Sequence, residues 1–116
     1  MSKYFSDDEL KCKCKRCDGG KMDAGFMRLL DSIREEYGAP LRVVSGFRCP
    51  SHNRDVGGVR SSLHLKGEAV DLSARDGEQA YKLALIAFAH GVCGIGVGKG
   101  FIHLDNRSSP GKLWTY

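Results

Sequence analysis

The stretch from Met22 to Tyr37 carries the clearest periodic pattern in the chain. Its apolar residues recur every three or four positions: Met22, Phe26, Leu29, Leu30, Ile33 and Tyr37. Such spacing places them along one side of an α-helix. Gly38 and Pro40 follow directly and end the helix. We therefore assign this apolar stripe to the hydrophobic core of the fold rather than to a ligand-binding surface.

A second helix and several short strands complete the pattern. Segment 73–76 resembles a capping signal for a helix that runs to about His90 and stops at Gly91, with apolar positions at Leu83, Ile86, Ala87 and Ala89. Strands are predicted at 41–45, 68–72, 93–97 and 101–105, with 112–116 as a candidate fifth. A short helix is expected after Ser6, and segment 46–60 is expected to be irregular. Two principal helices beside a small, mainly antiparallel sheet define an α+β fold.

The length of 116 residues fits a single domain, with residues 1–20 as a cysteine-rich segment packed on it. No apolar run approaches the ~20 residues of a membrane span, and the first residues have no signal-peptide pattern. The net charge of +4 favours anionic partners only mildly. We expect a small soluble domain that does not insert into a membrane.

The chain has five cysteines: Cys12, Cys14, Cys17, Cys49 and Cys93. An odd number without a secretion signal argues against a disulfide framework. The first three form a C-x-C-x-x-C pattern, which can share a metal ion if a fourth ligand arrives from elsewhere, and Cys49 is a candidate if the fold brings it near. The alternative is a set of small, partly buried thiols that fix a coiled N-terminal segment.

Polar residues that can carry chemistry lie in the predicted strands and at their ends. Alternation in the fourth predicted strand places His103, Asp105 and Arg107 on one face. Asp71 interrupts the otherwise apolar second strand, where a carboxylate needs a cation or several hydrogen-bond donors as its partner. Gly67 lets the chain turn between His64 and Asp71, so that both can point to one site.

His64, Asp71 and His103 together supply two imidazoles and one carboxylate. Such a set leaves the fourth position of a tetrahedral zinc ion open for water, as catalytic zinc sites do. The alternative is structural: histidines that are hydrogen-bonded within the core and an aspartate that anchors a turn. The residues alone leave these two readings open.

Four segments of the chain resemble the M15 zinc peptidases, a family of D-Ala-D-Ala carboxypeptidases and related peptidoglycan peptidases that includes phage endolysins. Residues 62–71 fit the signature S-x-H-x-x-G-x-A-x-D without a gap. Other motifs of that family, in the same order along the chain, resemble segments 45–50 (S-G-F-R-C-P), 94–97 (G-I-G-V) and 101–105 (F-I-H-L-D). The resemblance is close over residues 43–114 and includes the N-terminal stretch, as in short single-domain members. It implies the hedgehog/DD-peptidase fold.

The resemblance also implies roles for individual residues. It implies a Zn²⁺ ion held by His64, Asp71 and His103, with a bound water as the nucleophile. Arg48 lies where the family has an arginine that holds the substrate and stabilises the oxyanion, a task that suits a fixed guanidinium. Ser62, which opens the signature, is expected to contact the substrate.

The general base is the uncertain member of this set. Many members of the family carry Glu or Asp three residues before the last histidine ligand, where this chain has Gly100. Asp105 is the candidate base, because it lies one strand step from His103 on the same face; it equally fits a role in orienting that histidine. Glu68 and His52 are weaker candidates.

Three aromatic or imidazole side chains remain outside these roles. His90 is expected at the C-terminal end of a helix rather than in the site. Trp114 and Tyr116 are expected to pack on the sheet, and a place in the wall of a substrate groove is the alternative.

The sequence therefore predicts a monomeric zinc metallopeptidase that hydrolyses stem or cross-link peptides of peptidoglycan and has no nucleic-acid partner. Without a signal peptide, the protein would reach the cell wall by phage- or prophage-type release or inside a virion. Two alternatives remain: a non-catalytic zinc-binding virion or cell-wall-binding module, and a nucleic-acid-binding domain that uses the N-terminal cysteines. Carboxypeptidase and endopeptidase action, on D-Ala-D-Ala or L-Ala-D-Glu bonds, are both open.

Overall fold

A five-stranded sheet forms the centre of the computed structural model, which describes residues 2–14 and 16–116. Its strands are β1 (Val43–Ser45), β2 (Ala69–Ser73), β3 (Gly94–Gly98), β4 (Phe101–Asp105) and β5 (Lys112–Thr115). They lie in the order β1-β2-β4-β3-β5, and every neighbouring pair is antiparallel except β3 and β5. The predicted α+β class and mainly antiparallel sheet are confirmed.

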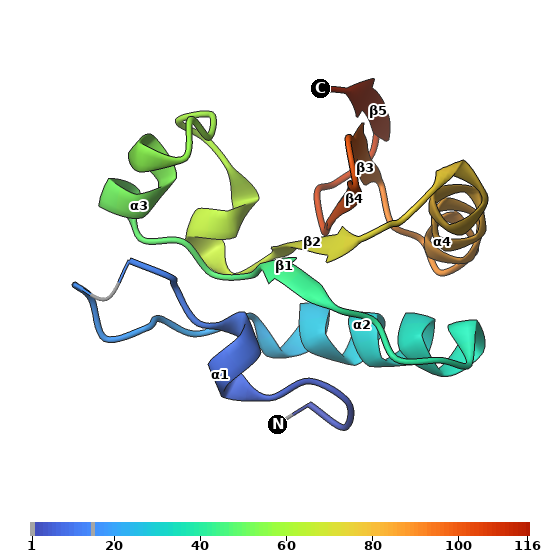
Figure 1. Ribbon diagram of the computed structural model, residues 1–116, viewed down its shortest axis with the longest axis horizontal. Coiled ribbons are helices and arrows are strands. Elements are labelled where there is room, and N and C mark those ends of the chain that lie inside the picture. The colour runs from blue at the N-terminus through green and yellow to red at the C-terminus, as the bar shows by residue number, and fades with distance from the viewer. Residues whose placement is uncertain (1, 15) are drawn as a thin grey trace.

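The helices are α1 (Asp7–Leu10), α2 (Ala24–Tyr37), α3 (Pro50–Asp55) and α4 (Gly77–Ala89), with one turn of 3₁₀ helix, η1 (Leu63–Lys66). The long helices α2 and α4 pack against one face of the sheet, whereas α3 lies on the other side of β1 and β2 from α1 and α2 (Figure 1). The core joins apolar side chains of α2 and α4 to those of β2 and β4: Phe26, Leu30, Ile33, Leu83, Ala87, Val70, Leu72, Ile102 and Leu104. Because side chains alternate along a strand, Asp71 and His103 point to the other face. No helix among the described residues is both long and apolar enough to span a bilayer.

The two long helices begin and end at the kinds of residue that the sequence pattern indicates. The Asp23 side chain accepts a hydrogen bond from the Phe26 amide at the start of α2, and Gly38 ends the helix in the left-handed region with φ 80°. Asp76 caps α4, which therefore starts after the predicted signal. Ala89 is exposed rather than apolar core, because it lies two residues beyond the buried Ala87 and so points away from it.

Segment 46–60 is not wholly irregular, because it contains α3. The sequence analysis treated Pro50 as a break, yet proline is favoured at the first position of a helix, where its missing N–H costs no hydrogen bond. The sulfur of Cys49 caps this helix by accepting from the His52 amide. Cysteine is not among the usual capping residues, so a cap at Cys49 was not expected.

The chain before β2 forms a single turn of 3₁₀ helix, η1, which the sequence analysis did not predict and which carries His64. The Ser62 side chain accepts a hydrogen bond from the His64 amide and so starts the turn. Gly67 ends it with φ 69°, as expected for a glycine that reverses the chain. A Cβ on Gly67 would also lie 2.5 Å from the Lys21 carbonyl oxygen, so two requirements select glycine here.

Candidate metal centre

Two of the three predicted ligands are neighbours across paired strands. Asp71 of β2 lies opposite His103 of β4 in the antiparallel register. Their side chains point to the same face, and His103 Nδ1 lies 2.9 Å from Asp71 Oδ1. The backbone pairing of the central strands therefore sets the separation of these two groups.

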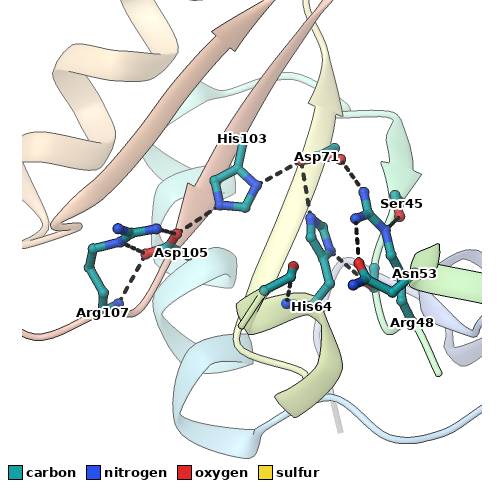
Figure 2. Close-up of polar contacts among 10 residues, drawn as sticks. Ser45, Arg48, Asn53, His64, Asp71, His103, Asp105 and Arg107 are labelled. Carbon is teal, nitrogen blue, oxygen red and sulfur yellow. Dashed lines mark hydrogen bonds and ion pairs between the residues drawn. The ribbon is translucent and has the colours of Figure 1, made fainter. Parts of the chain in front are cut away.

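His64 reaches the same point from η1. Its Nε2 lies 3.3 Å from Asp71 Oδ1, and one ligand atom from each of His64, Asp71 and His103 lies within 4.8 Å of the others. Figure 2 shows the two imidazoles approaching Asp71 from different sides. All three side chains are buried, with 2% to 6% of their surface exposed. The fold brings together the three residues that the sequence analysis grouped.

The hydrogen-bond partners of the two histidines assign their tautomers. His64 Nδ1 lies 2.7 Å from the carbonyl oxygen of Gly46, which only accepts, so Nδ1 carries the proton. His103 Nε2 lies 2.8 Å from Asp105 Oδ2 and donates to that carboxylate in the same way. Both rings must be neutral to bind a metal, and the lone pairs of His64 Nε2 and His103 Nδ1 are then directed toward Asp71 Oδ1, whereas without a metal a ring proton donates to Asp71. Three acceptors around one point require a cation, and two nitrogens with one carboxylate oxygen are a donor set that suits zinc.

Opposing charges keep the buried carboxylates ionised. Desolvation would raise the pKa of Asp71, but hydrogen bonds from His103 and His64 outweigh it and hold that pKa well below its usual value. Desolvation likewise opposes the charge on His103, yet its bonds to Asp105 and Asp71 hold the pKa of the imidazole above its usual value. A proton on His103 thus balances some of the negative charge when no metal is present.

Arg48 is fixed beside the centre by three hydrogen bonds. Its Nη2 donates to Asp71 Oδ2 at 3.1 Å, its Nη1 to Asn53 Oδ1 at 3.1 Å and its Nε to Ser45 Oγ at 3.1 Å. Asn53 is 3% exposed and also donates to the Val59 carbonyl oxygen at 2.8 Å. The sequence analysis did not assign this role to Asn53, because only the formation of α3 turns its amide toward the guanidinium.

Asp105 is enclosed on the other side of His103. It is fully buried, and besides His103 it accepts from Arg107 Nε at 2.9 Å and from Arg107 Nη2 at 2.7 Å. Desolvation would raise the pKa of Asp105, but the Arg107 guanidinium and His103 hold it well below the usual value. Both oxygens of Asp105 are therefore engaged by donors.

A cavity of about 910 Å³ opens over this face of the sheet. Its lining includes Arg48, His64, Asp71 and His103, with Trp114 and Tyr116 along one side. The Trp114 ring lies 5.2 Å from the His103 ring, and the Arg107 guanidinium lies 4.7 Å from the indole centroid. Trp114 thus packs on the sheet, as expected, and borders the cavity as well. Tyr116 is 70% exposed at the rim.

Glycines of β3 make room for these side chains. A Cβ on Gly94 would overlap the Asp105 carboxylate, one on Gly96 would lie 2.5 Å from Trp114 Nε1, and one on Gly98 would overlap the Phe101 ring. Because these glycines alternate along the strand, they all lie on the cavity face. The sequence analysis read this run only as a strand and missed its function in the site.

The remaining predicted residues have these positions. Ser62 lines the cavity, while neither Glu68 nor His52, both in the described part of the chain, does so. Gly100 lies in the turn between β3 and β4 with φ 83° and supplies no acidic side chain. His90 ends α4 and pairs with Glu36 at 2.8 Å, away from the site as expected.

Comparison with known proteins gives three findings. Residues 3–105 match the family described as Peptidase M15. A zinc D-Ala-D-Ala carboxypeptidase of Streptomyces albus G is 33% identical over 111 positions, which cover 84% of this chain and 42% of that protein. This chain thus spans less than half the length of that relative. The crystal structure of the L-Ala D-Glu endopeptidase ChiX of Serratia marcescens superposes with a TM-score of 0.60 at 17% identity, covering 74% of this chain and 80% of that one.

Proposed function

The chain belongs to the M15 peptidase family, and from this premise we propose that it is a zinc-dependent peptidase acting on peptide bonds of bacterial peptidoglycan. The substrate class is supported by the zinc D-Ala-D-Ala carboxypeptidase that is 33% identical. The site supports the reaction class independently of that similarity.

One observation carries the proposal. The lone pairs of His64 and His103 and an oxygen of Asp71 converge on one point, and that point lies in the wall of a cavity large enough for a peptide. A closed structural zinc site uses four protein ligands, whereas a catalytic site uses three and leaves the fourth position to water or substrate. The three-residue set at the base of an open cavity matches the catalytic kind.

His64, Asp71 and His103 would hold the zinc ion. When bound, zinc supplies a water of lowered pKa and a Lewis acid for the scissile carbonyl. Asp105 acts as a positioning residue: by accepting the His103 Nε2 proton it leaves Nδ1 as a lone pair directed at the metal position. With no exposed surface and with both oxygens bound by donors, Asp105 is poorly placed to take a proton from water.

Arg48 would hold the anionic part of the substrate. Its guanidinium lines the cavity beside Asp71, and Ser45 and Asn53 hold it in place. A fixed guanidinium binds a peptide carboxylate or stabilises the developing oxyanion of the scissile bond. Ser62 lies on the same wall, and its hydroxyl accepts a hydrogen bond from the His64 amide. The hydroxyl proton of Ser62 would donate to the peptide.

The hydrogen bonding of the carboxylates in the cavity favours a second candidate function, zinc binding without peptidase activity. Among the described lining residues, Asp71 and Asp105 are the acidic side chains, and both are already bound by other groups. A chain without a free general base would bind zinc and cell-wall peptide without efficient hydrolysis. Such a protein would be a non-catalytic module of the wall or of a virion.

We further propose that the protein works as a single-domain monomer at the cell wall, without a nucleic-acid partner. Membership of the M15 peptidase family and similarity to a zinc D-Ala-D-Ala carboxypeptidase support action on the extracellular side of the membrane. The resemblance to a family that includes phage endolysins supports delivery by a phage or prophage lysis system, and an endolysin function belongs to this proposal.

The test is incubation of the zinc-loaded chain with purified peptidoglycan and with defined stem peptides, followed by mass spectrometry of the products. We expect release of D-Ala from a pentapeptide or cleavage within the stem, loss of that activity on chelation and its return with zinc. His64→Ala should abolish cleavage, and His90→Ala, which changes a histidine outside the site, should retain it. Stoichiometric zinc without turnover on any of these substrates would favour the non-catalytic module, and cleavage by the metal-free protein would refute both.

A further inference from the structure

Four of the five cysteines meet at one point outside the candidate metal centre. Three of them, Cys12, Cys14 and Cys17, come from the segment that follows α1, and Cys49 comes from the loop that leads into α3. One sulfur from each lies within 4.8 Å of the others. The fold thus brings the fourth cysteine to the C-x-C-x-x-C segment. We propose that this cysteine cluster binds a structural zinc ion through four thiolates.

The spacing of the sulfurs suits a shared ion. Cys14 Sγ lies 3.5 Å from Cys17 Sγ and 3.7 Å from Cys49 Sγ. A zinc ion with Zn–S distances of about 2.3 Å and tetrahedral angles holds its sulfurs about 3.8 Å apart. A disulfide joins its sulfurs at about 2.05 Å. The arrangement therefore matches four sulfurs around one centre rather than a covalent pair with two bystanders.

Main-chain amides are directed at every sulfur of the cluster. The amides of Arg16, Gly19, Cys49 and His52 donate to the sulfurs of Cys14, Cys17, Cys12 and Cys49, at 3.2, 3.4, 3.4 and 3.4 Å respectively. A thiolate is a better acceptor than a thiol, so such bonds favour the deprotonated form that binds metal. In Cys14 and Cys17 the donor is the amide two residues further on, which folds the backbone around each sulfur. These bonds are a second, independent feature of a metal-binding loop.

The charge balance is consistent with a closed site. Binding replaces four thiol protons with one Zn²⁺ ion, so four protons are released and the complex carries a net charge of −2. Four protein ligands leave no position for water, which is the arrangement of structural rather than catalytic zinc. Lys11, Lys13 and Arg16 in the same segment supply compensating positive charge.

The cluster would fasten the N-terminal segment to the loop that carries Arg48. Cys49 follows Arg48 directly and caps α3, the helix that supplies Asn53. Arg16 makes a parallel connection, because its Nη2 lies 2.8 Å from Asp55 Oδ2 at the end of the same helix. An ion bound by the cysteine cluster would therefore hold α3 and, through Asn53, the guanidinium of Arg48.

The test counts the zinc ions bound to the intact chain, purified under reducing conditions, by native mass spectrometry. We expect two ions in the natural protein and in Cys93→Ser, which changes the cysteine outside the cluster. His64→Ala should keep one ion, because it disables only the candidate metal centre. Cys17→Ser should lose the ion of the cluster, whereas Cys17→His, which restores a fourth ligand, should keep it.

A spectroscopic measurement makes the result independent of whether the cysteine variants fold. His64→Ala loaded with Co²⁺ should show thiolate-to-cobalt charge-transfer absorption and the strong visible bands of a tetrahedral site. Cobalt binding without the charge-transfer band would overturn the proposal. So would a His64→Ala chain that binds no zinc, or a mass lower by two hydrogen atoms for each disulfide with no ion in the cluster. None of these readouts depends on peptidase activity, so the proposal stands or falls separately from the proposed function.

Discussion

Replacing Asp105 with asparagine tests how the second carboxylate controls the metal centre. Four N–H groups point at this side chain: Oδ2 accepts from His103 Nε2 and Arg107 Nη2, and Oδ1 accepts from Arg107 Nε and the Arg107 main-chain amide. The carboxylate accepts from all of them, whereas an asparagine amide has one oxygen that accepts and one nitrogen that only donates. Whichever way the amide turns, its nitrogen faces a donor.

The favoured orientation keeps the amide oxygen at the Oδ1 position, because Arg107 Nε and the Arg107 main-chain amide can only donate there, whereas the imidazole at the Oδ2 position can change its tautomer. The amide nitrogen of Asp105→Asn then faces His103 Nε2, which can accept only if the ring moves its proton to Nδ1. That atom is the proposed metal ligand, so the tautomer that suits asparagine is the one that cannot bind zinc. Loss of such a supporting partner costs about 10–100-fold in metal affinity, which corresponds to roughly 1.4–2.7 kcal/mol.

The single tryptophan of the chain provides the assay. The Trp114 ring lies 5.2 Å from the His103 ring, so its fluorescence reports on binding at this centre rather than at the cysteine cluster. We expect the zinc dissociation constant of Asp105→Asn, measured in zinc buffers, to rise about 10–100-fold. Asp8→Asn, which removes an exposed carboxylate of α1, should leave it unchanged. A dissociation constant for Asp105→Asn equal to that of the natural protein would refute the role assigned to Asp105.

Three further predictions concern stability and substrate binding. The pKa values of the two site carboxylates, Asp71 and Asp105, are lowered, and the pKa of His103 is raised. The stability that the carboxylates contribute is therefore lost as the pH falls below ~4, and the stability that His103 contributes is lost as the pH rises above ~6.5. The urea midpoint of the metal-free protein should be highest between these two values. Gly96→Ala should lower the free energy of unfolding by about 1–3 kcal/mol and shift the tryptophan fluorescence, because its Cβ would lie 2.5 Å from the indole nitrogen. As a control, the Cβ of Gly77→Ala meets no atom within 4 Å, so this variant should unfold at the same urea concentration as the natural protein. Asn53→Ala leaves Arg48 Nη1 without its acceptor, so we expect the free energy of unfolding to fall by about 1–3 kcal/mol and KM to rise with unchanged zinc content. An unchanged KM would contradict the proposed role of Arg48.

The sequence indicated the site on β2 and β4 because strand alternation is a local property. Alternation alone placed Asp71 and His103 on polar faces of otherwise apolar strands. It did not give the register that sets these two residues opposite each other, since pairing depends on the whole sheet. The residues alone suggested the group of His64, Asp71 and His103, and the family resemblance favoured metal binding over a purely structural role. The structure brings these three residues together.

The sequence failed where a helix depends on an unusual residue. Nothing in the local pattern marks Cys49 as a cap, so α3 was not predicted, and with it the contact between Asn53 and Arg48 was missed. His64 was expected near a strand, yet a single 3₁₀ turn between Ser62 and Gly67 carries it. Such short turns are stabilised by contacts with the rest of the fold rather than by the propensities of four residues.

The glycines of β3 have a consequence for how such sequences are interpreted. The run from Gly94 to Gly100 has glycine at every second position, a sequence pattern similar to that of the glycine-rich loops that hold nucleotide phosphates. Those loops need a helix N-terminus directly after the glycines, whereas this run forms a strand and a turn into the next strand. Here the missing side chains leave a recess on the cavity face of β3, where only the backbone forms the surface. That recess accommodates the Trp114 indole and the Asp105 carboxylate behind the metal ligands.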